Sequence, residues 1–402
     1  MEESLEEVVK KIKHGTADLT PEEDLLDKLK TSTEEGRPLR VKLGVDPSSS
    51  DLTLGHAVVL RKLRQLQDLG HLAVMVVGDF TRRIGDPSGR STTRKIMGAK
   101  EIEQNMKDYE RQVFRILDPE RTEFRYNSEW LGKLTFEDII ELTSKYTVAR
   151  MLERDDFSKR YSQNKPISIL EFLYPLAQAY DSVAVDADIE LGGSDQKFNL
   201  IVGRQIQREF DQEPQLVMTV PLLTGTDGSR AMSQTRGNYI GVNEAPEKMF
   251  GKLMSLSDET MPEYFELLTD MSFEDLEDLH PKKKKKKLAF QIVKSIYSEV
   301  EAEHAQEEFE RVFEDNLKPK DIEEVHVPAD EIKDDGSIWI LNLLEISGFV
   351  SSRSEARRLI DQGGVRLGDE QVNTVDFDPV LEGPVVLQVG KKKFARMVPE
   401  TD

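Results

Sequence analysis

Three polar side chains fall on one face of a predicted helix, and their chemical types suit the recognition of a small polar molecule. Residues 174–181 read Tyr-Pro-Leu-Ala-Gln-Ala-Tyr-Asp, which places Tyr174, Gln178 and Asp181 at positions i, i+4 and i+7. A buried phenol, amide and carboxylate would each need a hydrogen-bonding partner. The spacing therefore predicts a polar pocket on this face rather than an apolar core contact.

A loop of small residues elsewhere in the chain is typical of a nucleotide-binding site. The apolar run 41–45 leads into Asp46, a proline and serines, and a helical pattern begins at His56. A helix N-terminus favours phosphate, because its backbone N–H groups and its dipole attract negative charge. An ordinary tight connection between a strand and a helix would give the same pattern, so this loop alone is weak evidence.

Two further segments follow the same plan. Residues 85–90 read Gly-Asp-Pro-Ser-Gly-Arg after the apolar run 72–77, and residues 192–196 read Gly-Gly-Ser-Asp-Gln at the end of another apolar run. Each segment is typical of a strand end followed by a turn. Their order along the chain, together with the helix at 174–181, strengthens the nucleotide-binding interpretation.

Together these motifs resemble those of the bacterial tyrosyl-tRNA synthetases, class I aminoacyl-tRNA synthetases, in the subgroup with a compact C-terminal S4-type module. The resemblance covers essentially all 402 residues, and its specific part is the pair Tyr-x-x-x-Gln-x-x-Asp and Gly-Gly-Ser-Asp-Gln. It implies an α/β fold, with a Rossmann-like catalytic domain carrying a helical insertion, then an α-helical anticodon-side domain and a small α+β S4 domain. The implied activity is tyrosine–tRNA ligation, in which tyrosine is activated with ATP and transferred to tRNA(Tyr).

The resemblance also implies roles for individual residues. Asp181 would accept a hydrogen bond from the substrate phenol, and phenylalanine would be rejected because it leaves this buried carboxylate unpaired. Lys42 stands where other branches of the family place a tyrosine against the phenol. The tyrosine-binding residues implied in this way are Asp86, Tyr174, Gln178, Asp181, Gln196 and Lys42.

The nucleotide side of the site is assigned in the same way. The implied cofactor is ATP with Mg²⁺ as a substrate complex, and no tightly bound metal is expected. The implied ATP-binding residues are Asp46, Gly55, His56, Gly193, Asp195, Met232 and Gln234. The implied catalytic residues are His56, Thr53, Ser48, Arg90, Gln234 and Thr235.

Two signature sequences of the family are altered in this chain. The first, normally His-Ile/Leu-Gly-His, has Thr53 in place of its first histidine. The second, normally Lys-Met-Ser-Lys-Ser, reads Ala-Met-Ser-Gln-Thr at 231–235 and has lost both lysines. Losing one preorganised donor typically costs about 3–4 kcal/mol of transition-state stabilisation.

Two explanations of these losses remain open. In one, the positive charge has moved to nearby arginines. In the other, the protein is a synthetase paralogue that binds tyrosine or RNA and has lost efficient adenylate formation. The arginines that could carry the moved charge are Arg82, Arg83, Arg230 and Arg236.

The chain divides into four predicted parts. Residues 1–36 form an N-terminal helical segment, and residues 37–244 form the catalytic domain, with a helical insertion at about 100–165. Residues 245–325 form a helical anticodon-binding domain, and residues 336–402 form the S4-like domain after a charged linker. In the family, the insertion forms the dimer interface, so a homodimer is expected.

Basic residues in two places are candidates for RNA binding. Arg353, Arg357 and Arg358 lie at helical spacing and Arg366 follows a Gly-Gly turn, which predicts a phosphate-binding surface in the S4-like part. A solvated arginine face is the alternative. Six consecutive lysines at 282–287 indicate either a solvated helix N-terminus or a tRNA contact.

Composition limits the partners and the location. The formal net charge of −21 does not exclude tRNA, because phosphate binding needs only a local basic surface. An acidic surface also suits a halophilic source or an ordinary cytoplasmic protein. The chain has no cysteine, which excludes disulfides and thiolate metal sites. The start is acidic and no long apolar segment occurs, so we expect a cytoplasmic protein with no membrane partner.

Overall fold

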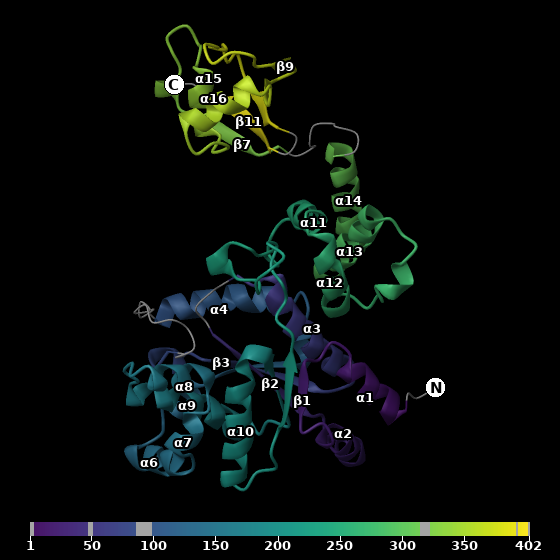
Figure 1. Ribbon diagram of the computed structural model, residues 1–402, viewed down its shortest axis with the longest axis vertical. Helices are drawn as coiled ribbons and strands as arrows, with labels where there is room; N and C mark the ends of the chain where they lie inside the picture. The colour runs from purple at the N-terminus through teal and green to yellow at the C-terminus, as the bar shows by residue number, and fades with distance from the viewer. Residues whose placement is uncertain (1–3, 47–50, 86–98, 314–321, 391–392, 401–402) are drawn as a thin grey trace. The chain divides into compact units, whose positions relative to one another are not determined.

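The computed structural model describes residues 4–46, 51–85, 99–313, 322–390 and 393–400 (Figure 1). The chain divides into two compact units, residues 1–299 and residues 300–402, and each has its own β-sheet. Within the described part of the chain, no helix combines the length and the hydrophobicity that crossing a membrane requires.

A six-stranded sheet organises the first unit. Its order is β1-β6-β5-β2-β3-β4, and all neighbouring strands are parallel except β1, which pairs antiparallel with β6. The chain leaves β2 toward β3 on one side and leaves β5 toward β6 on the other, so β2 and β5 flank the topological switch point. Open α/β sheets bind ligands at the carboxyl ends of strands at this point. The strands are β1 (Asp18–Thr20), β2 (Arg40–Val45), β3 (Leu72–Val77), β4 (Thr122–Tyr126), β5 (Ile189–Gly193) and β6 (Leu216–Val220).

Helices connect and cover these strands. α3 (Leu54–Asp68) joins β2 to β3, α4 (Ala99–Val113) joins β3 to β4, and α10 (Lys197–Glu209) joins β5 to β6. α9 (Ile169–Ala184) runs side by side with α10 (Figure 1). β3 and β6 are almost entirely buried and apolar, as expected for parallel strands covered on both faces. The Rossmann-like α/β prediction is therefore confirmed.

The predicted insertion at 100–165 needs a correction. Thr122–Tyr126 forms β4, an edge strand of the main sheet that pairs in parallel with β3. The alternation of polar and aromatic residues fits a half-buried strand, but five residues are too short a run to stand out in a segment that is otherwise mostly helical. The added helices begin after β4, and they are α5 (Ser128–Leu131), α6 (Phe136–Ser144), α7 (Val148–Met151) and α8 (Asp155–Ser162).

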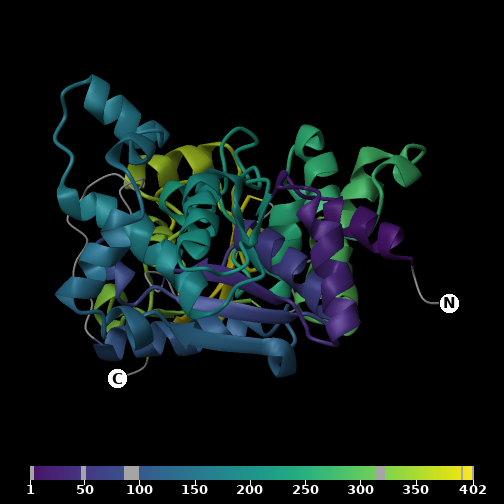
Figure 2. The same ribbon diagram turned by 90° about the horizontal axis from the view of Figure 1, so that it is seen from below.

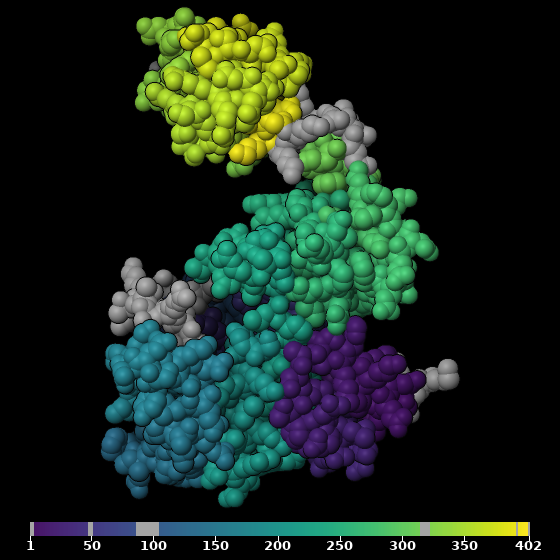
Figure 3. Space-filling view, in the orientation of Figure 1, coloured from purple at the N-terminus to yellow at the C-terminus, as the bar shows by residue number. Residues whose placement is uncertain are grey.

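The N-terminal segment is not purely helical either. It contains α1 (Leu5–Lys13) and α2 (Asp24–Glu35), as predicted, but β1 lies between them and extends the main sheet. Three residues are too few to give a strand pattern in the sequence. In Figures 2 and 3, α1 and α2 (purple) lie at the end of the first unit opposite the helices that follow β4 (blue).

The predicted helical domain at 245–325 is divided between the two units. α11 (Pro246–Met254), α12 (Met261–Leu268) and α13 (Pro281–Ile296) belong to the first unit, and α14 (Glu299–Phe313) lies almost wholly in the second. The six lysines form the first turns of α13. Lys285 pairs with Asp258 at 2.7 Å, and the Lys284 ammonium lies over the ring of Phe273.

A five-stranded sheet organises the second unit, in the order β7-β11-β10-β8-β9. α15 (Ile340–Ile346) and α16 (Arg353–Asp361) pack with it around one apolar core. β7 lies in the predicted linker, and it pairs in parallel with β11 at the far end of the unit, a partner that local sequence cannot reveal. The strands are β7 (Glu324–Val327), β8 (Val365–Leu367), β9 (Glu370–Gln371), β10 (Val385–Val389) and β11 (Lys393–Pro399).

Phe157 on α8 ties the added helices to α9, and its loss should destabilise the first unit. The ring is fully buried and makes an edge contact with Phe172, at 4.9 Å between ring centroids. Phe157→Ala should lower the free energy of unfolding by about 3–5 kcal/mol, because it leaves a cavity. Urea unfolding followed by Trp130 fluorescence, in a Trp339→Phe background, measures this change. Ser158→Ala, at an exposed position of the same helix, should change it by less than about 0.5 kcal/mol.

Candidate active site

The first signature sequence forms the N-terminus of α3. The backbone N–H of Thr53 donates to Nδ1 of His56 at 3.1 Å, and the Thr53 hydroxyl lies 3.0 Å from the same nitrogen. Because Nδ1 accepts a hydrogen bond, a neutral imidazole carries its proton on Nε2, which can donate to an anion. Partial desolvation by the surrounding loop lowers the pKa of His56 and favours this neutral form, although the residue keeps an exposed surface. Thr53 thus orients the remaining histidine of the signature.

The altered second signature packs against the first. The sulfur of Met232 lies 3.3 Å from the backbone N–H of Gly55 at the start of α3. The side-chain amide of Gln234 donates to the backbone oxygen of Asp51 at 3.0 Å. Thr235 is exposed on the same loop. The structure therefore brings Met232 and Gln234 to the nucleotide loop, where the resemblance assigned them.

Asp181 is a buried carboxyl with two side-chain donors. Trp130 Nε1 donates to Oδ1 at 2.8 Å, and Asn127 Nδ2 donates to Oδ2 at 3.3 Å. Burial raises the pKa of Asp181 to about 7, although the charge of Lys42 and the two hydrogen bonds oppose the rise. The carboxyl thus titrates near neutral pH and keeps its second lone pairs for another donor.

Lys42 lies beneath this carboxyl in a fully buried network. Its ammonium is 2.9 Å from Oε1 of Glu190 and donates to the Ser182 hydroxyl at 2.7 Å and to the backbone oxygen of Gln178 at 3.1 Å. These contacts account for the three N–H groups of an ammonium. The geometry therefore favours a supporting position for Lys42, in which its charge favours ionised Asp181, over the direct phenol contact that the resemblance implied.

The other two residues of the predicted polar face of α9 are only half-buried. The Gln178 amide oxygen accepts a hydrogen bond from Asn199 on α10 at 3.1 Å, which fixes its orientation. Tyr174 lies one turn earlier and is also half-buried. Both side chains thus lie on the same helix as Asp181, as the spacing predicted, and neither is sealed in the core.

Polar side chains fold back over the backbone at the end of β5. A Cβ on Gly193 would lie 2.6 Å from Oδ1 of Asp195, so that exposed side chain would have to move to make room for it. The backbone N–H of Gly193 donates to Oε1 of Gln196 at 3.2 Å. Asp195 and Gln196 are exposed at the carboxyl edge of the sheet, close in sequence to the buried end of β5.

Two residues of the site have no motif in the sequence. Asn127 and Trp130 hold Asp181, and the only local signal was the rarity of tryptophan, which occurs twice in the chain. Three residues of the predicted site lie outside the described residues. They are Ser48, Asp86 and Arg90.

Four arginines of the second unit lie on α16 and β8. Arg357 and Arg358 are exposed on α16. Arg353 lies over the ring of Trp339 and is 3.2 Å from Glu345. Arg366 is exposed on β8 and donates to a backbone oxygen in the following turn. The four side chains are therefore at the surface, with two of them partly engaged within the unit.

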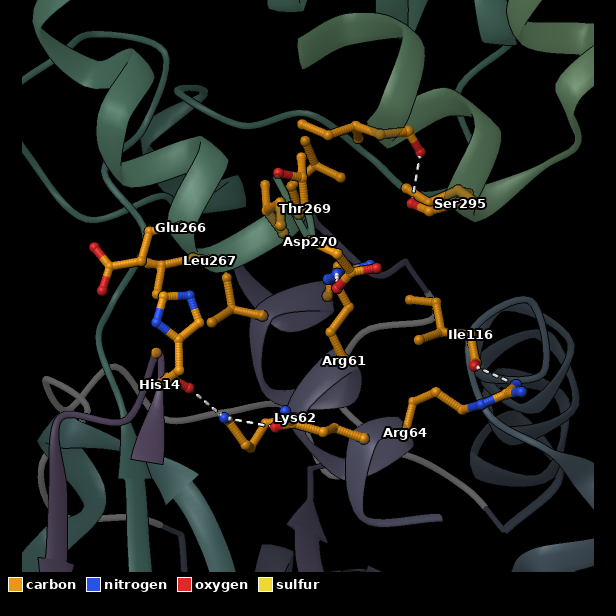
Figure 4. Close-up of a pocket in the computed structure, with 18 of the residues that line it drawn as sticks. His14, Arg61, Lys62, Arg64, Ile116, Glu266, Leu267, Thr269, Asp270 and Ser295 are labelled. Atoms are coloured by element: carbon orange, nitrogen blue, oxygen red, sulfur yellow. Dashed lines mark hydrogen bonds and ion pairs between the residues drawn. The ribbon is translucent and has the colours of Figure 1, made fainter. Parts of the chain in front are cut away.

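A cavity of about 370 Å³ also lies in the first unit, along α3 beside α12 and α13 (Figure 4). Its cations already have partners in the protein. Arg61 pairs with Asp270 at 2.9 Å, and Arg64 pairs with Asp68 at 2.8 Å. Lys62 donates to two backbone carbonyls at the end of α1, and burial lowers its pKa to about 8. We therefore interpret the cavity as a packing gap between helices rather than as a ligand-binding site.

Comparisons with known proteins agree with this architecture. The family of class I tRNA synthetases for tryptophan and tyrosine matches residues 34–314, and the S4 domain family matches residues 338–378. A tyrosine–tRNA ligase from Thermotoga maritima is 52% identical, covering 98% of this chain and 97% of the relative. A tyrosine–tRNA ligase from Carboxydothermus hydrogenoformans is 49% identical, covering 96% of each chain.

Solved structures share the fold at lower identity. A truncated mitochondrial tyrosyl-tRNA synthetase from Aspergillus nidulans has a TM-score of 0.63 at 20% identity, covering 78% of this chain and 95% of its own. A tyrosyl-tRNA synthetase from Archaeoglobus fulgidus, complexed with L-tyrosine, has a TM-score of 0.59 at 22% identity, covering 75% of this chain and 100% of its own. With the family matches above, the chain belongs to the class I tRNA synthetases of the tryptophan and tyrosine family and carries an S4 domain.

Proposed function

We propose that this protein is a tyrosine–tRNA ligase. The buried carboxyl of Asp181 carries the proposal, because it is held by Trp130 and Asn127 and lies on the helix that bears Gln178. In a purely apolar pocket this carboxyl would stay unpaired at a cost in free energy, whereas a substrate phenol would donate a hydrogen bond to it. The full-length similarity to tyrosine–tRNA ligases supports the same activity.

The chemistry needs positioning more than covalent help. An oxygen of the tyrosine carboxylate attacks the α-phosphorus of ATP, the bond from that phosphorus to the bridging oxygen breaks, and pyrophosphate leaves with the electron pair. A terminal hydroxyl of the tRNA then attacks the carbonyl carbon of the adenylate, and AMP leaves. The protein must align the two substrates and stabilise charge on the phosphates.

On the tyrosine side, Asp181 would accept the phenol hydrogen bond and Gln178, Tyr174 and Asp86 would bind the ammonium group. Gln196 would lie close to the same substrate. Rejection of phenylalanine follows because it leaves a buried carboxyl unpaired, an effect on the order of 10⁵ in enzymes of this type.

On the nucleotide side, the N-terminus of α3 and the Nε2–H of His56 would bind phosphate oxygens. Magnesium would enter with ATP as part of the substrate. The loop after β5 would bind the ribose through Gly193 and Asp195. The remaining residues that we assign to ATP binding or catalysis are Asp46, Ser48, Thr53, Gly55, Arg90, Met232, Gln234 and Thr235.

A non-catalytic paralogue is the alternative, and the altered loop at 231–235 is the observation that favours it. Such a protein would bind tyrosine without exchanging pyrophosphate into ATP. Tyrosine-dependent pyrophosphate exchange therefore separates the two functions. A ligase that uses tRNA would act in the cytoplasm.

We further infer a homodimer, because large apolar side chains are exposed together on the helices around α9. Phe136 and Ile169 are each 80% exposed, and they belong to α6 and α9. Exposed apolar patches of this kind are typical of protein interfaces. A second copy of the chain would cover them. The other exposed members of the patch are Ile140, Val148 and Leu170.

Substitution of Asp181 should weaken tyrosine binding and relax specificity. Asp181→Ala removes a hydrogen bond to a charged group, so the Kd for tyrosine should rise on the order of 10–100-fold, and discrimination against phenylalanine should fall. Calorimetry and pyrophosphate exchange with both amino acids measure this. Asp186→Asn, at an exposed position just after α9, is the matched control. Unchanged discrimination would remove Asp181 from the pocket.

Tyrosine affinity should also depend on pH. The pKa of Asp181 is raised to about 7 without substrate, so the carboxyl is largely protonated below that pH. The ionised form is the better acceptor for a phenol. Affinity should therefore rise between about pH 6 and pH 8 and then level, with proton release on binding at pH 6. Titration calorimetry in buffers of different ionisation enthalpy measures both effects, and Asp181→Asn should flatten the profile.

Charge at the apolar patch should break the dimer. Phe136→Glu combined with Ile169→Glu would place two carboxylates in a desolvated interface, so sedimentation velocity should give the monomer mass. Val380→Glu changes an exposed apolar residue of the second unit and should leave the dimer intact. A natural protein that sediments as a monomer would contradict the inference.

RNA binding should depend on the arginines of the S4 domain. Arg357→Glu with Arg358→Glu should weaken tRNA binding and reduce the slope of log affinity against log salt by about 0.7–0.9 for each lost phosphate contact. Filter binding over a salt series measures the slope. Lys282→Glu with Lys283→Glu on α13 is the matched comparison. If only the lysine variant lowers the slope, the lysine run is the RNA contact.

A further inference from the structure

Arg82 is a largely buried cation with an unsatisfied donor. It lies in the 3₁₀ turn η1 (Thr81–Arg83), shortly after β3, and its side chain is only 11% exposed. Its Nη1 atom is buried and has no hydrogen-bond partner among the described residues. A buried unpaired N–H group typically costs about 1–3 kcal/mol. Arg82 is therefore poorly explained as a structural residue alone.

The unsatisfied atom faces the start of the nucleotide loop. Nη1 of Arg82 is 3.8 Å from Oδ1 of Asp46, which follows the last residue of β2. At this distance the two groups form an ion pair but are too far apart for a hydrogen bond. The Nη1–H donor of Arg82 therefore stays available, while the carboxylate of Asp46 holds the guanidinium nearby. The β2 end belongs to the topological switch point, where ligands of such sheets bind.

The other side of the same turn is tied to the tyrosine pocket. The Thr81 hydroxyl accepts a hydrogen bond from Nδ2 of Asn127 at 3.1 Å, and the same Nδ2 is 3.3 Å from Asp181. The turn is thus bounded by the proposed tyrosine pocket on one side and by Asp46 on the other. The carboxylate of tyrosine must meet the α-phosphate of ATP between these two places.

The adjacent arginine has different surroundings. Arg83 is exposed, and its guanidinium lies over the ring of Phe80 at 5.4 Å from the centroid. Arg236 is also exposed and donates to the backbone oxygen of Ala231 within its own loop, at 3.1 Å. Arg230 is exposed as well. Of these four arginines, Arg82 is thus the one whose side chain is largely buried with a donor unpaired among the described residues.

We propose that Arg82 contacts the α-phosphate of ATP and supplies positive charge that the signature loop has lost. The inference rests on the proposed ligase function. As the tyrosine carboxylate attacks the phosphorus, negative charge grows on the non-bridging oxygens, and Nη1–H donates to one of them. No proton leaves Arg82, and pyrophosphate departs as in the reaction above. Asp46 keeps the guanidinium oriented between turnovers.

The central experiment compares two neighbouring substitutions. Arg82→Met should lower the rate constant of adenylate formation about 10²–10³-fold, because one preorganised donor to the transition state is lost. The Kd for tyrosine should change less than about threefold, since binding of the amino acid does not use this donor. Arg83→Met, the matched control, should leave both quantities within about threefold. Single-turnover kinetics and titration calorimetry on the full-length protein measure them.

A second pair of substitutions tests whether the charge has moved. Ala231→Lys with Gln234→Lys restores the lysines of the signature. These changes should raise adenylate formation more in the Arg82→Met protein than in the natural one, because the two sources of charge serve the same transition state. If the two lysines raise the rate constant of adenylate formation by the same factor in the natural protein and in Arg82→Met, the proposal is wrong. Arg82→Lys, which keeps the charge, should recover part of the rate and also shows whether the position tolerates substitution.

Failure of the inference differs from failure of the proposed function. If Arg82→Met exchanges pyrophosphate as fast as the natural protein, the role of Arg82 is wrong and the ligase function stands. If the natural protein binds tyrosine but exchanges no pyrophosphate, the ligase function is wrong and the role of Arg82 falls with it. Melting temperatures within a few degrees of the natural protein establish that the variants are folded.

Discussion

The active site depends on one buried ion pair, between Lys42 and Glu190. The two charged groups are 2.9 Å apart, and their side chains are 0% and 1% exposed. They join β2 to β5 at the topological switch point, and Lys42 also bonds to Ser182 and to the backbone of Gln178 on α9. Removing one partner of such a pair typically costs about 3–5 kcal/mol, because it leaves a buried charge uncompensated. The pair therefore fixes α9, and with it the proposed tyrosine-binding face, relative to the two central strands.

The same network sets the electrostatics of Asp181. Burial favours the neutral carboxyl, whereas Lys42, Trp130 and Asn127 favour the ionised one, and the opposing effects leave its pKa near neutral. A hydrogen bond from a phenol would stabilise this buried carboxyl more than it would stabilise a carboxyl in water, because the buried group has lost its hydration. In the proposed ligase, selectivity for tyrosine over phenylalanine would follow from this group, because it is costly to bury without a partner.

The two altered signature sequences pack against each other, although they lack the first histidine and both lysines of the usual pattern. Thr53 holds the imidazole of His56 through its backbone and hydroxyl, and Met232 still packs at the N-terminus of α3. Gln234 bonds to the loop backbone as a neutral group. Packing and charge are thus separable properties of this loop. Its geometry is compatible with nucleotide binding, whereas in the proposed ligase the stabilisation of phosphate charge would require another cation.

The sequence by itself determined the family, the α/β fold and the face of α9, because motifs and helical spacing depend on neighbouring residues of one segment. It did not reveal β1, β4 or β7, which are short or half-buried strands whose pairing partners lie far along the chain. Only the tertiary structure identified Trp130 and Asn127 as partners of Asp181, and only it separated the largely buried Arg82 from the exposed Arg83. The burial and the direction of a side chain depend on distant segments of the chain that pack against it. The residues next to it in the sequence do not indicate which segments these are.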